Sequence, residues 1–155
     1  MTHQIKFKAW HKEYKKMYEV KSIEWINESD GEIGFITLWP MSVDVNSCTL
    51  DDVELMQWTG LVIDGNHIYV GDLLEYDSCK LKPEWAKERH VFEVKWAPSE
   101  YMFALQNIKT KGYSGLAESE NMILIGNIYM NPDMLNASRQ EAPDIYNCNN
   151  DMEDK

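Results

Sequence analysis

The feature that most constrains this fold is a series of short segments in which apolar and polar residues alternate. A clear example lies at residues 91–96, where Phe92, Val94 and Trp96 would share one face while Glu93 and Lys95 would share the other. A period of two is that of a half-buried β-strand. The sequence therefore predicts a mostly-β protein with short helices.

Tight turns separate these segments. Asp64-Gly65 is the strongest hairpin signal in the chain. Gly71-Asp72 is expected to form a positive-φ bend, with the Asp72 side chain accepting hydrogen bonds from nearby backbone amides. Short strands joined in this way are typical of a small SH3-like β-barrel, which we predict over residues 49–135. Strands of the whole chain are expected at 4–10, 16–20, 33–39, 73–77, 91–96, 101–105 and 122–129.

Two short helices are predicted among the strands. The first spans 49–58, with Thr49 as its N-cap, acidic residues in its first turn and Gly60 at its left-handed C-terminal end. The second begins at Asn131-Pro132 and runs through Leu135. Residues 109–115 are expected to form a mobile loop.

The chain divides into three predicted regions. Residues 1–48 would form a β-hairpin and a further strand that pack on the barrel of residues 49–135. The tail, residues 136–155, is rich in Asn, Asp and Glu and is expected to be disordered.

Charge is distributed unevenly. The net charge is −11, but the first 16 residues carry +4 and the remainder −15. An acidic body disfavours general binding to nucleic-acid phosphates, because such binding needs cationic side chains. The three cysteines show no CxxC spacing, which favours a reducing compartment. Without an apolar segment of signal-peptide or membrane-span length, we expect a cytoplasmic protein.

The basic N-terminal hairpin is the one candidate binding site. Its lysines lie beside aromatic residues, a combination that could hold single-stranded nucleic acid through phosphate contacts and base stacking. The alternative is that Lys6 and Lys8 protect an edge strand from aggregation while the aromatic residues fill the core. The candidate residues are Lys6, Lys8, Trp10, Lys12, Lys15 and Lys16.

No residue pattern indicates catalysis, a metal or a cofactor. The histidines lack metal-ligand spacings, and a pair of Cys79 with His90 has no evident third group to orient it. The glycines form no phosphate-binding loop. Gly60, Asp64, Gly65, Gly71 and Asp72 are expected to serve backbone geometry.

Three blocks of the chain resemble the YopX family of phage and prophage proteins. They are Ile5-Lys-Phe-Lys-Ala-Trp10 with Lys15-Lys-Met-Tyr18, Leu55-Met-Gln-Trp-Thr-Gly-Leu61 with Ile68-Tyr-Val-Gly-Asp72, and Ile125-Gly-Asn-Ile-Tyr129 with Asn131-Pro132. Trp58 stands where Tyr or Phe is usual, and His11 where an acidic residue is common. The resemblance implies a small, mostly-β protein encoded by a temperate phage or prophage of a Gram-positive bacterium, and it carries over no catalytic residue.

Three functions follow, in decreasing order of support. The first is a non-enzymatic protein-interaction module acting in the host cell, whose acidic surface could engage a basic host or phage protein. The second is an accessory protein that binds nucleic acid through the basic hairpin. The third is an enzyme of unknown type, and homo-oligomerisation stays open in all three.

Overall fold

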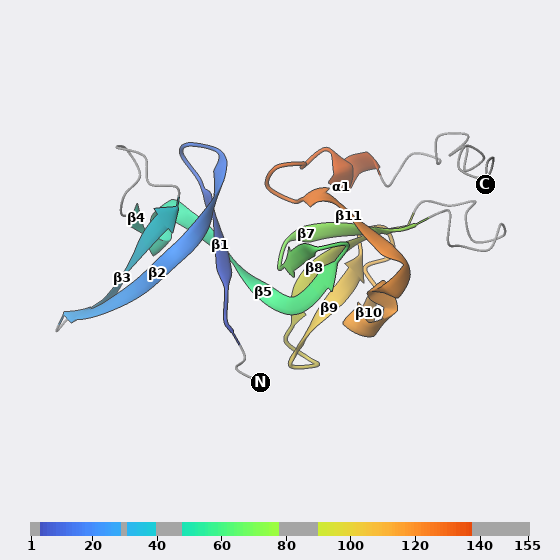
Figure 1. The fold of residues 1–155 in the computed structure, drawn as a ribbon, viewed down its shortest axis with the longest axis horizontal. Coiled ribbons are helices and arrows are strands. Elements are labelled where there is room, and N and C mark those ends of the chain that lie inside the picture. The colour runs from blue at the N-terminus through green and yellow to red at the C-terminus, as the bar shows by residue number, and fades with distance from the viewer. Residues whose placement is uncertain (1–3, 29–30, 40–47, 78–89, 138–155) are drawn as a thin grey trace, which may run out of the picture.

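Two antiparallel β-sheets make up the fold, seen here in a computed structural model that describes residues 4–28, 31–39, 48–77 and 90–137 (Figure 1). The first sheet has the order β4-β3-β2-β1-β5-β6 and the second the order β10-β9-β8-β7-β11. The strands are β1 Phe7–His11, β2 Lys16–Glu28, β3 Gly31–Trp39, β4 Cys48–Thr49, β5 Val53–Ile63, β6 Asn66–Tyr69, β7 Asp72–Tyr76, β8 Val91–Ala97, β9 Met102–Asn107, β10 Tyr113–Gly115 and β11 Met122–Asn127.

The mostly-β prediction is confirmed, and the arrangement of the strands is more specific than predicted. Each sheet ends in two edge strands, so the described strands form two sheets and not one closed barrel. An SH3-like arrangement stays a prediction. The first sheet includes strands from both sides of the predicted boundary at residue 48, and the division into three regions also stays a prediction.

Strand β5 connects the two sheets and contributes to both cores (Figure 1). Val53, at its start, lies in a cluster with Ala9, Ile36 and Leu38. Ile63, at its end, lies in a second cluster with Ile68 of β6 and with residues of the other sheet: Leu74, Phe92, Val94, Leu105 and Met122. Because the same strand is buried in both clusters, the two sheets are held in one structure.

The predicted helix over 49–58 is wrong. The structure has a 3₁₀-helix at Leu50–Asp52, followed directly by β5. Val53 and Leu55 pack in the first core cluster, whereas Met56 points to the other face of the sheet and is also buried. Because both faces of β5 are covered, its apolar residues do not alternate, and their spacing imitates that of a helix.

Thr49 does cap a helical turn, although the turn is shorter than predicted. Its backbone N and its Oγ1 each lie 2.8 Å from Oδ2 of Asp52. These hydrogen bonds lower the pKa of the Asp52 carboxyl. The prediction of Thr49 as an N-cap is therefore confirmed. The prediction that fails is the helix beyond Asp52, where the chain forms β5.

The hairpin predictions are confirmed. Strands β1 and β2 pair antiparallel, with Ala9 opposite Tyr18. Asp64 and Gly65 have φ values of 47° and 81°, which are both positive as a two-residue hairpin turn requires. Gly71, with φ of 89°, immediately precedes β7 as predicted.

The remaining sequence predictions have mixed outcomes. Part of the predicted loop at 109–115 is strand β10, Tyr113–Gly115, which pairs with β9. The second 3₁₀-helix, Leu116–Asn121, then leads into β11. The short terminal helix exists as α1, Met134–Ala137, but the Asn131 side chain accepts a hydrogen bond from the backbone of Asn127 and does not cap it.

The other outcomes concern the tail and the helices. The predicted tail lies almost wholly outside the described residues. Among the residues that the structure describes, no helix is long and apolar enough to cross a membrane.

Gly60 provides a test of backbone strain in β5. It lies where the β5–β6 register shifts between Trp58 and Val62, and its φ is 89°. We expect Gly60→Ala to lower the free energy of unfolding by about 1–2 kcal/mol, because an L-residue is strained at positive φ. Urea denaturation would measure this loss.

Gly115→Ala is the matched control. A Cβ atom added at either glycine meets nothing within 4 Å, but Gly115 has an ordinary φ of −71°. We expect this variant to keep the wild-type stability within about 0.5 kcal/mol. Equal losses in the two variants would contradict the role assigned to positive φ.

Candidate functional site

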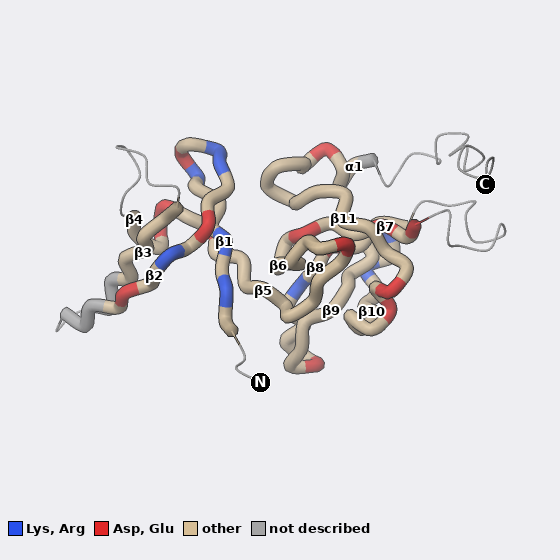
Figure 2. Tube along the Cα trace, viewed as in Figure 1, with Lys and Arg blue, Asp and Glu red and all other residues tan. Residues whose placement is uncertain are grey.

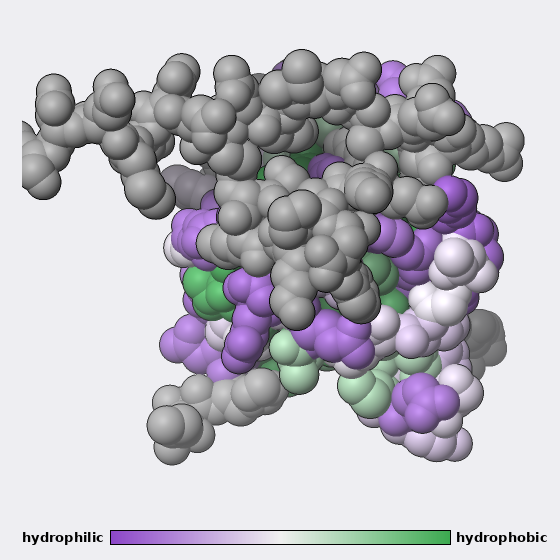
Figure 3. All heavy atoms as spheres, turned by 90° about the vertical axis from the view of Figure 1, so that its right-hand side faces the viewer, coloured by the Kyte–Doolittle hydropathy of each residue, from purple (hydrophilic) through white to green (hydrophobic). Residues whose placement is uncertain are grey.

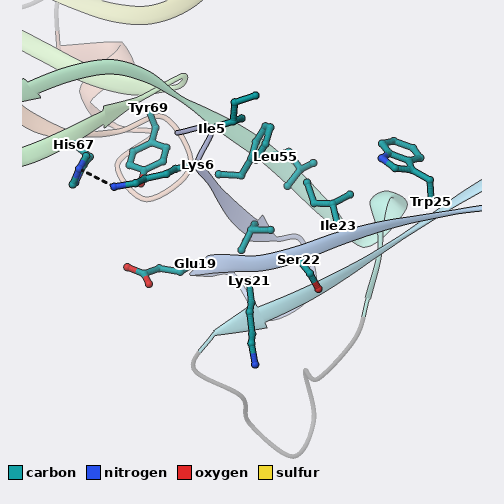
Figure 4. A pocket seen from close by; sticks show the side chains of 12 residues that line it. Ile5, Lys6, Glu19, Lys21, Ser22, Ile23, Trp25, Leu55, His67 and Tyr69 are labelled. Carbon is teal, nitrogen blue, oxygen red and sulfur yellow. Dashed lines mark hydrogen bonds between the residues drawn. The ribbon is translucent and has the colours of Figure 1, made fainter. Parts of the chain in front are cut away.

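A hollow of about 850 Å³ opens in the first sheet at the point where β2 leaves β1 (Figure 4). Strand β2 is 13 residues long, but it pairs with β1 only over Lys16–Glu19. Its remaining residues stay paired with β3. The hollow is lined by Ile5, Lys6, Phe7, Glu19, Val20, Lys21, Ser22, Ile23, Trp25, Leu55, His67 and Tyr69.

The floor of the hollow is apolar and belongs to the first core cluster. Val20, Ile23 and Leu55 are half-buried residues that pack against the buried side chains of that cluster. Ile5 and Trp25 remain 65% and 59% exposed. Hydrophobic residues of this size, exposed beside an apolar floor, indicate a surface that can bind another molecule.

Trp25 is positioned by the strand opposite it. It pairs with Gly34 of β3. A Cβ atom at Gly34 would lie 3.3 Å from Cζ3 of Trp25 and 2.5 Å from Cδ1 of Leu50. The absence of a side chain at residue 34 therefore leaves the space in which these two side chains rest.

The opposite end of the hollow carries a cation. Nζ of Lys6 lies 3.3 Å from Nε2 of His67 and 4.9 Å from the ring centroid of Trp58 (Figure 4). Since an ammonium group can only donate, Nε2 is the acceptor in this contact. The His67 ring in turn stands edge-on to Trp58, with 5.0 Å between the ring centroids.

Tyr69 forms the wall behind this cation. Its side chain is 6% exposed, and Nζ of Lys8 lies 4.5 Å from the centroid of its ring. Burial raises the pKa of the Tyr69 phenol, and the negative charges of Glu19 and Asp72 raise it further. The wall is therefore a neutral phenol with a lysine stacked on it.

A buried carboxylate fixes the position of this wall. Oδ2 of Asp72 accepts a hydrogen bond of 2.8 Å from the backbone N of Tyr69, and Oδ1 accepts one of 2.9 Å from Nδ2 of Asn127. Nδ2 of Asn127 also lies 3.5 Å from Sδ of Met56. Residues of β5, β6, β7 and β11 thus meet at one polar contact, where the two sheets join.

The pKa of the Asp72 carboxyl reflects this position. Burial raises it, and the hydrogen bonds from Asn127 and Tyr69, together with the charge of Lys8, offset part of the rise. The carboxyl is 8% exposed but has both oxygens hydrogen-bonded, so its burial is compensated.

Comparison with known proteins identifies the family. The YopX family model, described as YopX protein, matches residues 6–136. The chain belongs to the YopX family. No curated protein matches the chain.

Two crystal structures of YopX-like proteins share the fold. Protein EF1440 from Enterococcus faecalis is 24% identical, with a TM-score of 0.59; the match covers 86% of this chain and 99% of that one. Protein yopX from Bacillus subtilis is 18% identical, with a TM-score of 0.51; the match covers 84% of this chain and 95% of that one. At these identities the likeness shows the fold alone.

The lysines predicted as a nucleic-acid site are largely engaged within this YopX-family chain. Lys6 and Lys8 lie over the rings of Trp58 and Tyr69. Nζ of Lys12 lies 3.1 Å from Oε1 of Glu54. Figure 2 shows basic and acidic residues interleaved along this hairpin.

The other three candidates are arranged differently. Trp10 stacks on Tyr129, with ring centroids 6.0 Å apart. Lys15 and Lys16 are exposed at the turn between β1 and β2. Lys6, Lys8 and Trp10 stand at alternate positions and so share one face of the strand, whereas Lys15 and Lys16 lie at the turn.

The alternative reading of Lys6 and Lys8 fits only one of the two lysines. From Lys8 onward β1 lies between β2 and β5 and is not an edge strand, whereas at Lys6 it no longer pairs with β2. Both lysines also cover aromatic rings contributed by β5 and β6.

The histidines and cysteines are scattered. His11 is buried against Tyr14 and Tyr18, and His90 lies against Tyr76. Cys48 is a buried free thiol whose pKa is raised by burial and by the charge of Asp52. Cys79, the proposed partner of His90, and Cys148 lie outside the described residues.

Sequence reasoning missed the hollow. Trp25, Leu55, His67 and Tyr69 were not candidate site residues, since they come from three strands and share no short motif. The difference in length between β1 and β2 could have indicated the hollow. Strand β2 continues well beyond the short strand β1 with which it pairs, so part of its edge is left open.

Asp72 predicts a pH dependence of stability. Because the folded-state pKa is raised, the folded protein holds this proton to higher pH than the unfolded chain, whose value is near 3.8. The contribution of Asp72 to stability is therefore greatest below pH 3.8 and falls as pH rises through the folded pKa. The variant Asp72→Asn has no carboxyl to titrate, so its free energy of unfolding should fall less as pH rises. Urea denaturation at a series of pH values would measure this difference.

The same variant should be less stable at neutral pH. An amide has one oxygen, so Tyr69 N or Asn127 Nδ2 would lose its acceptor, at a cost of about 1–3 kcal/mol. A variant with unchanged stability and an unchanged pH profile would contradict the assigned contacts.

Proposed function

We propose that this YopX-family protein is a non-enzymatic binding module that holds a partner protein in the hollow beside β1, β2, β5 and β6. The observation that carries the proposal is the apolar floor of that hollow, open to solvent between the exposed side chains of Ile5 and Trp25. Filling it would bury apolar surface, which is the main favourable term in protein association.

The groups that line the hollow suit recognition. Apolar side chains supply packing, Trp25 supplies a large aromatic contact, and Lys6 with His67 supplies charge and hydrogen bonding at one end. Aromatic residues and a few precisely placed polar groups are typical of protein-binding surfaces.

Overall charge would act at longer range. The chain carries −11 in total, which favours the approach of a partner that is basic as a whole. Within the hollow, contacts shorter than the screening length of about 8 Å decide what is held. We place this activity in the cytoplasm of a bacterial host, and the encoding gene in a phage or prophage.

An exposed tryptophan of the second sheet offers a comparison with the hollow. On the side of the molecule shown in Figure 3, hydrophobic residues of the described chain appear as separate patches among hydrophilic ones. Trp96, on β8, is 48% exposed, and its ring stands edge-on to that of Phe103, with 5.2 Å between the ring centroids. It serves as a matched control for Trp25.

Site-specific photo-cross-linking tests the proposal. With the cross-linker at Ile23, on the floor of the hollow, we expect a saturable, discrete protein adduct in lysate of the bacterial host, and no such adduct with the cross-linker at Val62, which is 49% exposed at the other end of β5. Ile5→Glu and Trp25→Ala should each reduce the adduct about tenfold or more, because hot-spot contacts at a binding site carry that much energy.

The controls separate binding from folding. Trp96→Ala should leave the adduct at its wild-type level. All three substituted side chains are exposed, so each substitution should change the free energy of unfolding by about 0.5 kcal/mol or less. Trp25→Ala also loses the packing of Trp25 on Gly34. Equal adducts from Ile23 and Val62, or equal yields from Trp25→Ala and Trp96→Ala, would refute the proposal.

The alternative, nucleic-acid binding, has a separate test. Since Lys6, Lys8 and Lys12 contact groups within the protein, we expect no saturable binding of a single-stranded DNA oligonucleotide at low ionic strength, measured by fluorescence anisotropy. Binding that falls steeply with salt and is lost in the double variant Lys15→Glu, Lys16→Glu would favour the alternative.

A further inference from the structure

Strand β2 presents an open backbone edge to the hollow. Its register with β1 ends at Glu19, whereas its pairing with β3 continues from Glu19 to Glu28. Among the described residues, β2 has no other neighbouring strand. From Val20 to Trp25, one edge of β2 therefore pairs with β3 and the other faces the hollow.

Strand β1 presents a second open edge on the other side of the hollow. The carbonyl O of Lys6 accepts a hydrogen bond of 2.8 Å from N of Trp58 in β5. In an antiparallel strand the N–H and C=O groups of successive residues point to opposite sides. The backbone groups of Ile5 and Phe7 therefore point away from β5, toward the hollow.

Unpaired strand edges are templates for another strand. An exposed edge attracts pairing because its N–H and C=O groups can bond to an extended chain, and natural proteins usually block such edges. Here the edge is short, twisted by the register shift between Val20 and Ser22, and flanked by the charged residues Glu19 and Lys21. These features limit indiscriminate pairing but leave room for one selected segment.

We propose that the hollow binds an extended segment of a partner protein by strand addition to the β2 edge between residues 20 and 25. This inference rests on the proposed function and specifies how the partner is held. Main-chain hydrogen bonds to β2 supply affinity, and side chains at alternate positions of the segment enter the hollow and supply specificity.

The lining of the hollow defines the segment. The side chains of the partner segment that face Val20, Ile23 and Leu55 are apolar, because the floor of the hollow offers them no polar partner. A carboxylate lies near Lys6, because the lining of the hollow contains two lysines, Lys6 and Lys21, and a single acid, Glu19. The partner segment thus combines alternating apolar residues with an acidic residue at one end.

The test begins with a defined probe. A phage-displayed library of random peptides, each of about ten residues, is selected on the full chain after depletion on the Ile5→Glu variant. We expect enrichment of peptides with alternating apolar residues and a terminal acid. If no enriched peptide depends on Ile5, strand addition is refuted.

A synthetic copy of the enriched peptide then reports on its backbone. N-methylation of alternate amides should weaken binding about fivefold for each hydrogen bond lost, whereas methylation of the intervening amides should have little effect. Amide hydrogen exchange of β2 residues 20–25 should slow on binding. Uniform tolerance of N-methylation, with unchanged exchange in β2, would refute strand addition even for a peptide that binds in the hollow.

The charge of the segment is tested separately. Replacing the acid of the peptide by its amide, and Lys6 by Met, should each weaken binding about three- to fivefold, and the two changes together should cost no more than one of them. Lys111→Met, at an exposed site outside the hollow, is the control. Full additivity would refute contact between Lys6 and the carboxylate.

The outcomes distinguish this inference from the proposed function. If a partner is cross-linked at Ile23 but N-methylation of the peptide has no effect, the proposed binding function is retained and strand addition is refuted. Displacement of the peptide by a single-stranded oligonucleotide identifies a nucleic-acid site, and sedimentation of the free chain as a dimer that blocks the peptide identifies a second copy as the occupant. Either result overturns the assigned partner.

Discussion

The structure depends on one strand that must be buried at both ends in different cores. Val53 lies in the cluster of the first sheet, and Ile63 lies in that of the second. A regular strand cannot turn its side chains toward two separate cores without a change of twist. The change occurs at Gly60, where positive φ and a register shift form a bulge, since bulges increase local twist.

The hollow follows from this constraint. Because β5 continues past β1 to pair with β6, it carries Tyr69 and His67 to the N-terminal end of β1, opposite the part of β2 that has diverged. The Asp72 carboxylate then fixes the backbone of Tyr69 from the second sheet. One side of the hollow is therefore anchored in both sheets, and the other side consists of β2 and its partner β3.

Local sequence signals were enough for the turns and for most strands. Asp64-Gly65 and Gly71-Asp72 have few alternatives to the conformations that they adopt, and the alternation in β8 reflects one buried and one partly exposed face. The same reasoning failed at Val53 and Met56, where both faces of the strand are buried and the period of two disappears. It failed for β10 because three residues are too few to show a period.

The candidate site was harder to predict because it is a property of the sheet and not of a segment. Lys6 was recognised as basic, but its contacts with Trp58 and His67 depend on strand order, which no residue pattern in the chain encodes. Trp25 was unremarkable in sequence, and its exposure results from the point at which β1 ends. The resemblance to the YopX family gave the fold class correctly and, as expected, gave no site.

The divergence of β2 from β1 also affects how the molecule moves. Within the part of the chain that the structure describes, β2 beyond Glu19 pairs only with β3, and β3 pairs only with β2 and the two residues of β4. Segments with few cross-strand contacts open at a lower free energy than the global unfolding of a domain. We therefore expect β2 and β3 to bend about the register shift after Val20, which lies in the lining of the hollow.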